Sequence, residues 1–345
     1  MEQSSESPKN TLKRRGFVTA GLASLTALGI PARIGAAPEN NAATLEKKKF
    51  RSPFVYPFHI GEVEAWSISD ANLQLGEGLG LMWPVEDRPQ MKEVLETHSE
   101  QTKTLPLFVN VLVLRKGKEV MLFDAGFGQH GNPRLGWLMD GLAQIGIRPE
   151  DVTAGFLSHA HSDHLNGFVM GEKTAFPNMA FHLLPAELGF WRGKKPDFSK
   201  SKRDKNPLPN MVSEARKNFD ILEAQTVLLK PQQELFGGLV TVEPAPGHTD
   251  GHACFRIRSG DDELLHLMDL AHHHLLMFAN PNWTIAFDHN PVVAVETRKK
   301  FWQDAAAKRT RCFGFHLPWP GLGHIIPEKT GYRWWAESWQ WPQVL

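Results

Sequence analysis

The sequence is poor in cysteine and carries no excess charge of either sign. Its 345 residues include only two cysteines, Cys254 and Cys312. Two cysteines cannot build a disulfide framework or a cysteine-rich zinc site, and whether they pair is left open. Basic and acidic residues both number 38, so the basic excess that nonspecific nucleic-acid binding requires is missing. We therefore expect no nucleic-acid partner.

Long apolar runs are also missing. The stretch at 17–32 has 16 residues without a charge, and only Gly16 separates it from the paired Arg14 and Arg15. It is only mildly apolar, and a spanning helix needs about 20 strongly apolar residues. Paired arginines, a weak apolar run and small residues at 35–37 resemble a twin-arginine export signal. We expect a signal peptide over 1–37, a linker over 38–52, and a periplasmic or secreted mature protein without a stable membrane span.

Beyond residue 52 the pattern alternates between strands and helices. Strands are expected at 63–69, 108–114, 119–124, 152–157, 181–184, 239–243, 253–258 and 264–268. Helices are expected at 135–145, 185–191 and 296–308. Runs of strands interrupted by helices predict an α/β fold, in which two sheets pack together with helices outside. Residues 53–345 are expected to form one domain.

The strongest chemical signal follows directly after the expected strand at 152–157. Three histidines and an aspartate lie within six residues there, namely His159, His161, Asp163 and His164. Imidazole and carboxylate groups are suitable ligands for zinc and similar divalent ions, whereas packing gives no reason for such a density of polar groups. Residues two apart in an extended segment point the same way, so His159 and His161 share a side. Asp163 and His164 could then serve a second centre.

Three further candidate ligands lie at or near the ends of other strands. His248 sits in a Pro-Gly-His-Thr turn, Asp269 follows the strand at 264–268, and His316 follows Phe-Gly-Phe. A carboxylate just beyond an apolar strand suits a bridge between two cations, which then lie about 3.5–4 Å apart. We therefore expect two divalent metal ions, with zinc as the first candidate and manganese, iron and cobalt left open.

This order of ligands resembles the metallo-β-lactamase superfamily. The resemblance rests on the H-x-H-x-D-H loop at 159–164, a lone histidine in a turn, an aspartate and a final histidine. It implies a four-layer αβ/βα sandwich with the metals in a cleft at one edge of the sheets. It assigns His159, His161 and His248 to the first metal, Asp163, His164 and His316 to the second, and Asp269 to both. By the same resemblance Asp124, in an Asp-Ala-Gly turn, supports the orientation of a ligand.

Within the superfamily the likeness is greatest to the methyl parathion hydrolases and their relatives. It extends over most of the mature chain and includes residues 176–178, 189–191, 295–300 and 316–325. N-acyl-homoserine lactonases share the same seven ligands and are the alternative. The tyrosine that those lactonases place near the metals has no clear counterpart, since Tyr56 and Tyr332 lie at opposite ends of the mature chain. Relatives often form dimers, so a homodimer is left open.

The expected reaction is hydrolysis of an ester, a lactone or a phosphotriester in a small-molecule substrate. A hydroxide that bridges two divalent cations is a strong nucleophile near neutral pH, because the metals lower the pKa of bound water to about 7. Asp163 or Asp269 would accept the proton. No Gly-x-Ser-x-Gly motif offers a serine nucleophile instead. A β-lactamase, against which Asp269 argues, an iron-dependent oxidoreductase and a non-catalytic binding module are the other candidates.

Further residues are candidates for the wall of the pocket. His252 is expected to support the structure or a ligand rather than to bind a metal. At least one histidine of the run 272–274, with His272 first, is expected to line the pocket or orient a ligand, and a solvated edge is the alternative. Trp191 is expected to be a pocket wall or a core aromatic residue. The basic segment 192–205 is expected to be a solvated loop or a cover over the pocket.

Overall fold

A computed structural model describes residues 55–128 and 134–338 of the chain. The expected signal peptide at 1–37 and linker at 38–52 lie outside the described residues. Among the residues that are described, no helix combines the length and the apolar character needed to cross a membrane.

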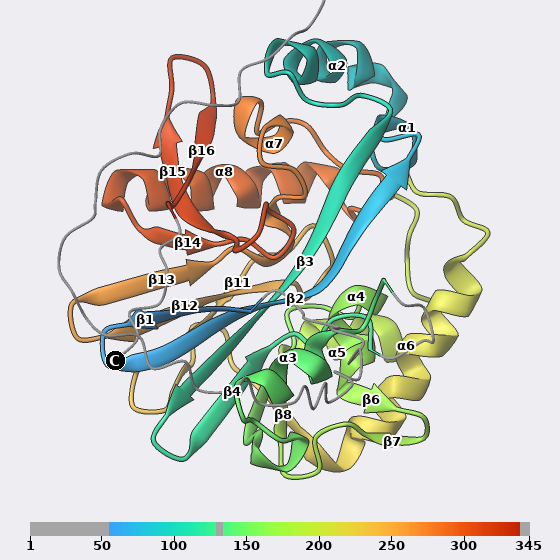
Figure 1. Ribbon diagram of the computed structural model, residues 1–345. Helices are drawn as coiled ribbons and strands as arrows, with labels where there is room; N and C mark the ends of the chain where they lie inside the picture. Colours follow the sequence, from blue (N-terminus) through green and yellow to red (C-terminus); the bar gives the residue numbers. More distant parts are fainter. Residues whose placement is uncertain (1–54, 129–133, 339–345) are drawn as a thin grey trace, which may run out of the picture. The chain divides into compact units, whose positions relative to one another are not determined.

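Two seven-stranded sheets carry the fold (Figure 1). In spatial order the first consists of β1 (Val55–Ile60), β2 (Val63–Gly76), β3 (Thr104–Lys116), β4 (Glu119–Phe123), β5 (Ala154–Phe156), β8 (Ala180–Leu183) and β9 (Thr226–Leu228). The second consists of β10 (Glu234–Leu235), β11 (Val240–Pro244), β12 (Ala253–Ser259), β13 (Asp262–His266), β14 (Arg311–Phe313), β15 (Leu322–Pro327) and β16 (Tyr332–Ala336). The strands β4, β5, β8 and β9 run parallel, as do β13 and β14, and the other neighbours are antiparallel.

The apolar runs in the sequence bury both faces of each sheet. Successive side chains of a strand point to opposite faces, so an uninterrupted apolar strand serves two cores at once. In β3, Leu112 and Leu114 pack between the two sheets, whereas Val111 and Val113 face the helices on the outside. Phe255 of β12 joins the core between the sheets, and each such fully buried side chain contributes about 1.5–3 kcal/mol through the hydrophobic effect.

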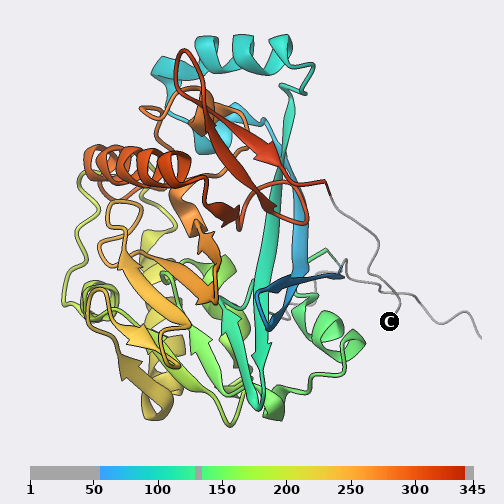
Figure 2. The same ribbon diagram turned by 90° about the vertical axis from the view of Figure 1, so that its left-hand side faces the viewer.

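Helices cover the outer faces, which gives a four-layer αβ/βα sandwich (Figure 2). The first sheet is covered by α3 (Leu138–Gln144), α5 (Pro185–Arg192) and α6 (Leu208–Leu222), and the second by α7 (Leu276–Ala279) and α8 (Pro291–Lys308). The short helix α4 (Ser162–Leu165) follows β5, and a small hairpin is formed by β6 (Val169–Met170) and β7 (Lys173–Thr174). The predicted α/β sandwich is thereby confirmed.

Several elements were not expected from the sequence, among them β1, α6 and the strands β14, β15 and β16. Between β2 and β3 the chain also forms α1 (Leu79–Met82) and α2 (Arg88–Thr97), where no helix was expected. Met91 and Leu95 of α2 form a separate apolar cluster with Leu276 of α7. The insertion therefore has a small core of its own beside the sandwich.

Candidate metal centre

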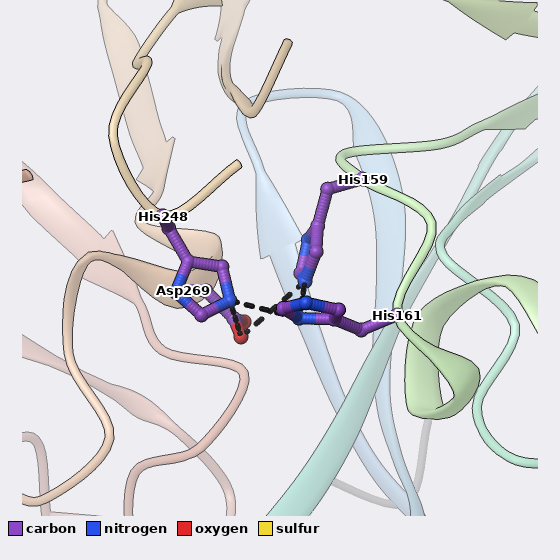
Figure 3. Close-up of side chains that lie close together, drawn as sticks. All are labelled: His159, His161, His248 and Asp269. Carbon is purple, nitrogen blue, oxygen red and sulfur yellow. Dashed lines mark hydrogen bonds and ion pairs between the residues drawn. The ribbon is translucent and has the colours of Figure 1, made fainter. Parts of the chain in front are cut away.

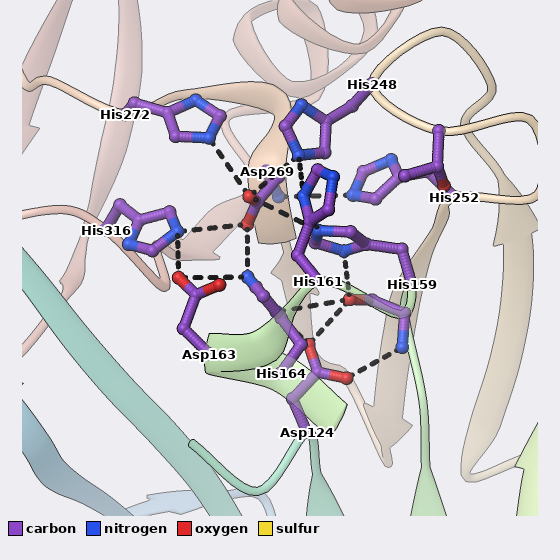
Figure 4. A network of polar contacts seen from close by, with 12 residues as sticks. Asp124, His159, His161, Asp163, His164, His248, His252, Asp269, His272 and His316 are labelled. Carbon is purple, nitrogen blue, oxygen red and sulfur yellow. Dashed lines mark hydrogen bonds and ion pairs between the residues drawn. The ribbon is translucent and has the colours of Figure 1, made fainter. Parts of the chain in front are cut away.

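The seven candidate ligands lie just after the carboxyl ends of strands. These strand ends meet at one edge of the two sheets. His159, His161, Asp163 and His164 follow β5, His248 follows β11, and His316 follows β14. Asp269 lies in a short 3-10 helix (Met268–Leu270) after β13, which ends at His266, two residues earlier than we expected. Because parallel strands end at the same edge, ligands as far apart in the sequence as His159 and His316 converge here (Figure 4).

The first group consists of His159, His161, His248 and Asp269, all of which are buried (Figure 3). The Nε2 atoms of His159 and His248 lie 2.9 and 3.0 Å from Nδ1 of His161. Oδ2 of Asp269 lies 3.1 Å from Nε2 of His248. One ligand atom from each of the four residues lies within 4.8 Å of every other, which is close enough to surround one cation.

The second group consists of Asp163, His164 and His316, and it lies on the other side of Asp269 (Figure 4). Oδ1 of Asp269 is 3.1 Å from Nε2 of His164 and 3.3 Å from Nε2 of His316. Oδ2 of Asp163 lies 3.5 Å from the same nitrogen of His316. The two oxygens of Asp269 thus face different groups, which is the geometry that a carboxylate shared by two cations requires.

Four of the histidines have their outer nitrogen held by an acceptor. Nδ1 lies 2.6 Å from Asp124 in His164, 2.9 Å from Asp288 in His248, 2.7 Å from a backbone carbonyl in His316, and 3.0 Å from a serine hydroxyl in His159. With the proton fixed on Nδ1, the lone pair of Nε2 points into the cluster.

Two atoms that face the middle of the cluster are buried without a hydrogen-bond partner. They are Nε2 of His164 and Oδ1 of Asp269. Buried polar atoms without a partner are costly, and cations placed between the two groups would satisfy both atoms. The donor set of imidazoles and carboxylates therefore fits two divalent ions.

The pKa shifts of the residues in the cluster also favour the binding of cations. Burial lowers the pKa of His159 and His161 well below the usual value. Burial also opposes a charge on His248, but the carboxylates of Asp269 and Asp288 outweigh it and raise its pKa to about 9. The pKa of Asp269 is held well below its usual range, because the imidazoles around it, His164 first, outweigh the effect of burial. The ionised carboxylate of Asp269 attracts cations, and a metal ion would take the place of the additional proton on His248.

The backbone is strained at two residues that aim these carboxylates. Asp124 has a φ of 57° and Met268, directly before Asp269, has a φ of 47°. Left-handed backbone at residues other than glycine costs about 1–3 kcal/mol and is concentrated at functional sites. At Asp124 the conformation directs the carboxylate to the backbone N–H of Ser158, at 2.7 Å, as well as to His164.

The structure brings the four expected supporting residues to the cluster. Asp124 holds His164, as described above. His252 accepts a hydrogen bond from the backbone N–H of Asp269 at 3.2 Å, and its Nδ1 is 2.8 Å from a backbone carbonyl. Nε2 of His272 lies 3.0 Å from Oδ2 of Asp269. Trp191 is fully buried and packs its ring edge-on to His161, with 6.1 Å between the ring centroids.

Two buried acids near the cluster, Glu187 and Asp288, were not among the residues expected from the sequence. Glu187 is fully buried in α5 and accepts four hydrogen bonds, from the N–H groups of Ala160 and Gly251, the indole of Trp191 and the hydroxyl of Thr249. These donors belong to both ligand loops and to α5, so one carboxylate ties the three segments together. Neither acid sits in a recognisable motif, because its partners are distant in the sequence.

The remaining expectations have simple outcomes. His273 is buried beside Trp83, and His274 pairs with Glu100 at 3.2 Å, so of the three neighbouring histidines only His272 reaches Asp269. Cys254 and Cys312 are buried as separate free thiols.

In the basic segment 192–205, Phe198 and Ser201 are buried, and the ring of Phe198 lies 4.7 Å from that of His289. This segment therefore packs against the protein close to the cluster.

The chain is similar to a known protein family and to solved structures. The family model described as the metallo-beta-lactamase superfamily matches residues 104–310. No match is found among the curated proteins. The solved structure of AidC, a dizinc quorum-quenching lactonase in complex with a product, N-hexnoyl-L-homoserine, is similar, with a TM-score of 0.80 and 28% identity over 84% of this chain and 99% of AidC. The hydrolase AbOPH has a TM-score of 0.74 and 24% identity over 83% of this chain and 98% of AbOPH.

Proposed function

From the premise that the chain belongs to the metallo-beta-lactamase superfamily, we propose that it is a dinuclear metal hydrolase that cleaves an ester, a lactone or a phosphotriester. One observation carries this proposal. The two oxygens of Asp269 face separate ligand groups, His164 and His316 on one side and His248 on the other. Seven ligands arranged in this way support two metal ions, for which we propose zinc first.

The ions, when bound, would supply Lewis acidity and lower the pKa of water to about 7. The protein itself must accept and return a proton. We propose Asp163 for this role, because its side chain is 16% exposed whereas that of Asp269 is 3% exposed and has both oxygens among imidazoles. Asp163 would take the proton of the attacking water and pass it to the leaving alkoxide, so that acid and alcohol are released.

Lactones are the first substrates that we propose. Support comes from AidC, a quorum-quenching lactonase that is 28% identical to this chain and is covered by it almost completely. The missing tyrosine is a weaker objection than the sequence suggested, because His272 presents an imidazole next to Asp269. Burial lowers the pKa of His272 to about 4, so this ring is neutral at neutral pH and has a single N–H, which can serve either Oδ2 of Asp269 or a substrate oxygen but not both at once.

Phosphotriesters are the second candidate. The likeness of residues 189–191, 295–300 and 316–325 to the methyl parathion hydrolase branch carries this alternative. The same proton acceptor would serve, since water would add to phosphorus and an aryl oxide would leave.

A substrate panel tests the proposal. Metal-saturated protein is offered an acyl-homoserine lactone, an aryl ester, an aryl phosphotriester and a β-lactam, and we expect turnover of at least one of the first three. Asp269→Asn should abolish this turnover, whereas Asp261→Asn, which changes an exposed aspartate in the turn between β12 and β13, should leave it intact. Absence of turnover on the whole panel, or full activity of Asp269→Asn, would reject the proposal.

Export and assembly are separate proposals. We propose that residues 1–37 form a twin-arginine-type signal, 38–52 a linker and 53–345 the hydrolase domain, on the strength of Arg14, Arg15 and the weak apolar run after them. Replacing both arginines with lysine should keep the protein in the cytoplasm. A homodimer is the assembly that the resemblance favours, and light scattering of the mature protein tests it.

A further inference from the structure

One polar side chain interrupts the apolar strand β3. Asn110 lies between Val109 and Val111, and all three residues are fully buried. Residues two apart in a strand point the same way, so Asn110 shares the face of β3 that carries Leu112 into the core between the sheets. A buried amide is costly unless hydrogen bonds satisfy it, so the partners of Asn110 indicate what it does.

The N–H groups of Asn110 serve one loop of the second sheet. The backbone N–H donates to the carbonyl of Phe315 at 2.9 Å. The side-chain Nδ2 donates to the carbonyls of Gly314 and Leu317 at 3.1 and 2.7 Å. These three acceptors flank the candidate ligand His316 on both sides. The side-chain Oδ1 is buried without a partner within residues 55–128 and 134–338, so the hydrogen bonds of this amide all go to the loop.

The same loop is fixed to β3 at a second point. Nδ1 of His316 donates to the carbonyl of Phe108 at 2.7 Å, and this bond turns Nε2 toward the second ligand group. Phe108 and Asn110 are two residues apart on β3. Four hydrogen bonds therefore join a three-residue stretch of one strand to the loop that carries His316.

This contact joins the two halves of the second ligand group. His164 comes from α4 after a strand of the first sheet, whereas His316 follows a strand of the second sheet. The ring of Phe315 is stacked on that of His164, with 4.1 Å between the centroids and 23° between the ring planes. The position of the loop against Asn110 therefore sets how far apart the two imidazoles lie. The first group is joined elsewhere, through the carboxylate of Glu187.

We propose that Asn110 is a positioning residue of the metal centre, which sets the affinity for the second ion and leaves that for the first unchanged. This inference rests on the proposed dinuclear hydrolase and adds to it a residue outside the seven ligands. Asn110 belongs to neither ligand group. It acts through the backbone of the loop that carries His316, because its hydrogen bonds hold that loop of the second sheet against a strand of the first.

Titration of the metal-free protein with Cd²⁺, followed by cadmium NMR, tests the assignment, because cadmium ions with different ligands give separate signals. The wild type should give two signals, and the signal that His316→Ala removes marks the second ion. Asn110→Leu keeps a side chain of similar size but leaves the carbonyls of Gly314 and Leu317 without their donor. Competition with a chelator should then show an affinity for the second ion that is lower by about 10–100-fold, as for other residues that orient ligands, and an unchanged affinity for the first.

Leu112→Ala is the matched control, because it removes buried apolar contacts from the same face of β3 and no hydrogen bond to the loop. It should lower the resistance to urea and still give both cadmium signals. Unchanged affinity for the second ion in Asn110→Leu, an equal loss of both ions, or the same loss in Leu112→Ala would overturn the inference.

A second variant covers the case in which Asn110→Leu does not fold. Asn110→Asp keeps the shape of the side chain and replaces the amide N–H donors with oxygen, and the same titration should again show selective weakening of the second ion. A wild type that gives a single signal in excess Cd²⁺ would reject the dinuclear centre itself, and the assignment of Asn110 with it. Two signals in the wild type and equal affinities in Asn110→Asp would reject the assignment alone.

Discussion

A substitution of Glu187 should weaken metal binding although it changes none of the seven candidate ligands. Its carboxylate accepts hydrogen bonds of 2.8 Å from Ala160 and 2.6 Å from Trp191 on one oxygen, and of 2.6 Å from Thr249 and 3.1 Å from Gly251 on the other. Burial raises the pKa of this carboxyl, and the four donors oppose the rise. The side chain belongs to neither ligand group, but it sets the spacing between the loop of His161 and the loop of His248.

The four hydrogen bonds determine how much unfolding free energy and metal affinity a Glu187 variant should lose. In Glu187→Gln the amide oxygen still serves Ala160 and Trp191, and the amide nitrogen can donate to the hydroxyl of Thr249. The N–H of Gly251 then faces another donor and stays unpaired, which costs about 1–3 kcal/mol. Glu187→Ala leaves all four donors without an acceptor, and we expect a loss of about 3–5 kcal/mol, as for a broken buried polar network. Metal affinity should fall about 10–100-fold in Glu187→Gln, because the support of the ligands is altered.

Urea unfolding of the metal-free protein and competition with a chromophoric chelator measure the two effects separately. Glu64→Gln is the control, since it makes the same change in a half-exposed pair with Arg115, where a loss of about 0.2–1 kcal/mol is expected. The reasoning is refuted if Glu187→Gln binds metal as tightly as Glu64→Gln and unfolds at the same urea concentration.

Two further predictions concern buried aspartates. Asp288→Asn removes the carboxylate that fixes the proton of His248 on Nδ1, and the chelator titration should show metal affinity lowered about 10–100-fold, whereas unchanged affinity would deny Asp288 this role. Burial raises the pKa of Asp70 from 3.8 to about 6, so its contribution to stability is complete below pH 3.8 and is lost as the pH rises through about 6. Between pH 4 and pH 7 the wild type should therefore lose about 3 kcal/mol of unfolding free energy relative to Asp70→Asn, and parallel pH profiles in urea would contradict this.

The sequence was most informative where the relevant contacts are local. The ligands at 159–164 are neighbours in one loop, and the buried part of β3 is a continuous, valine-rich apolar run of the length of a strand. Glu187 could not be found in this way, because it lies on a helix with nothing to mark it, and its importance comes from loops that tertiary structure brings to it. The helix α2 did carry a signal, since Met91 and Leu95 are four residues apart and Pro89 stands in its first turn.

Crystals of the metal-saturated protein, measured at wavelengths on either side of the zinc absorption edge, test the central claim most directly. The account predicts two anomalous peaks per chain, one against His159, His161 and His248 and the other against Asp163, His164 and His316, with Asp269 between them. A single peak in a fully loaded crystal, with either group left without an ion, would contradict it.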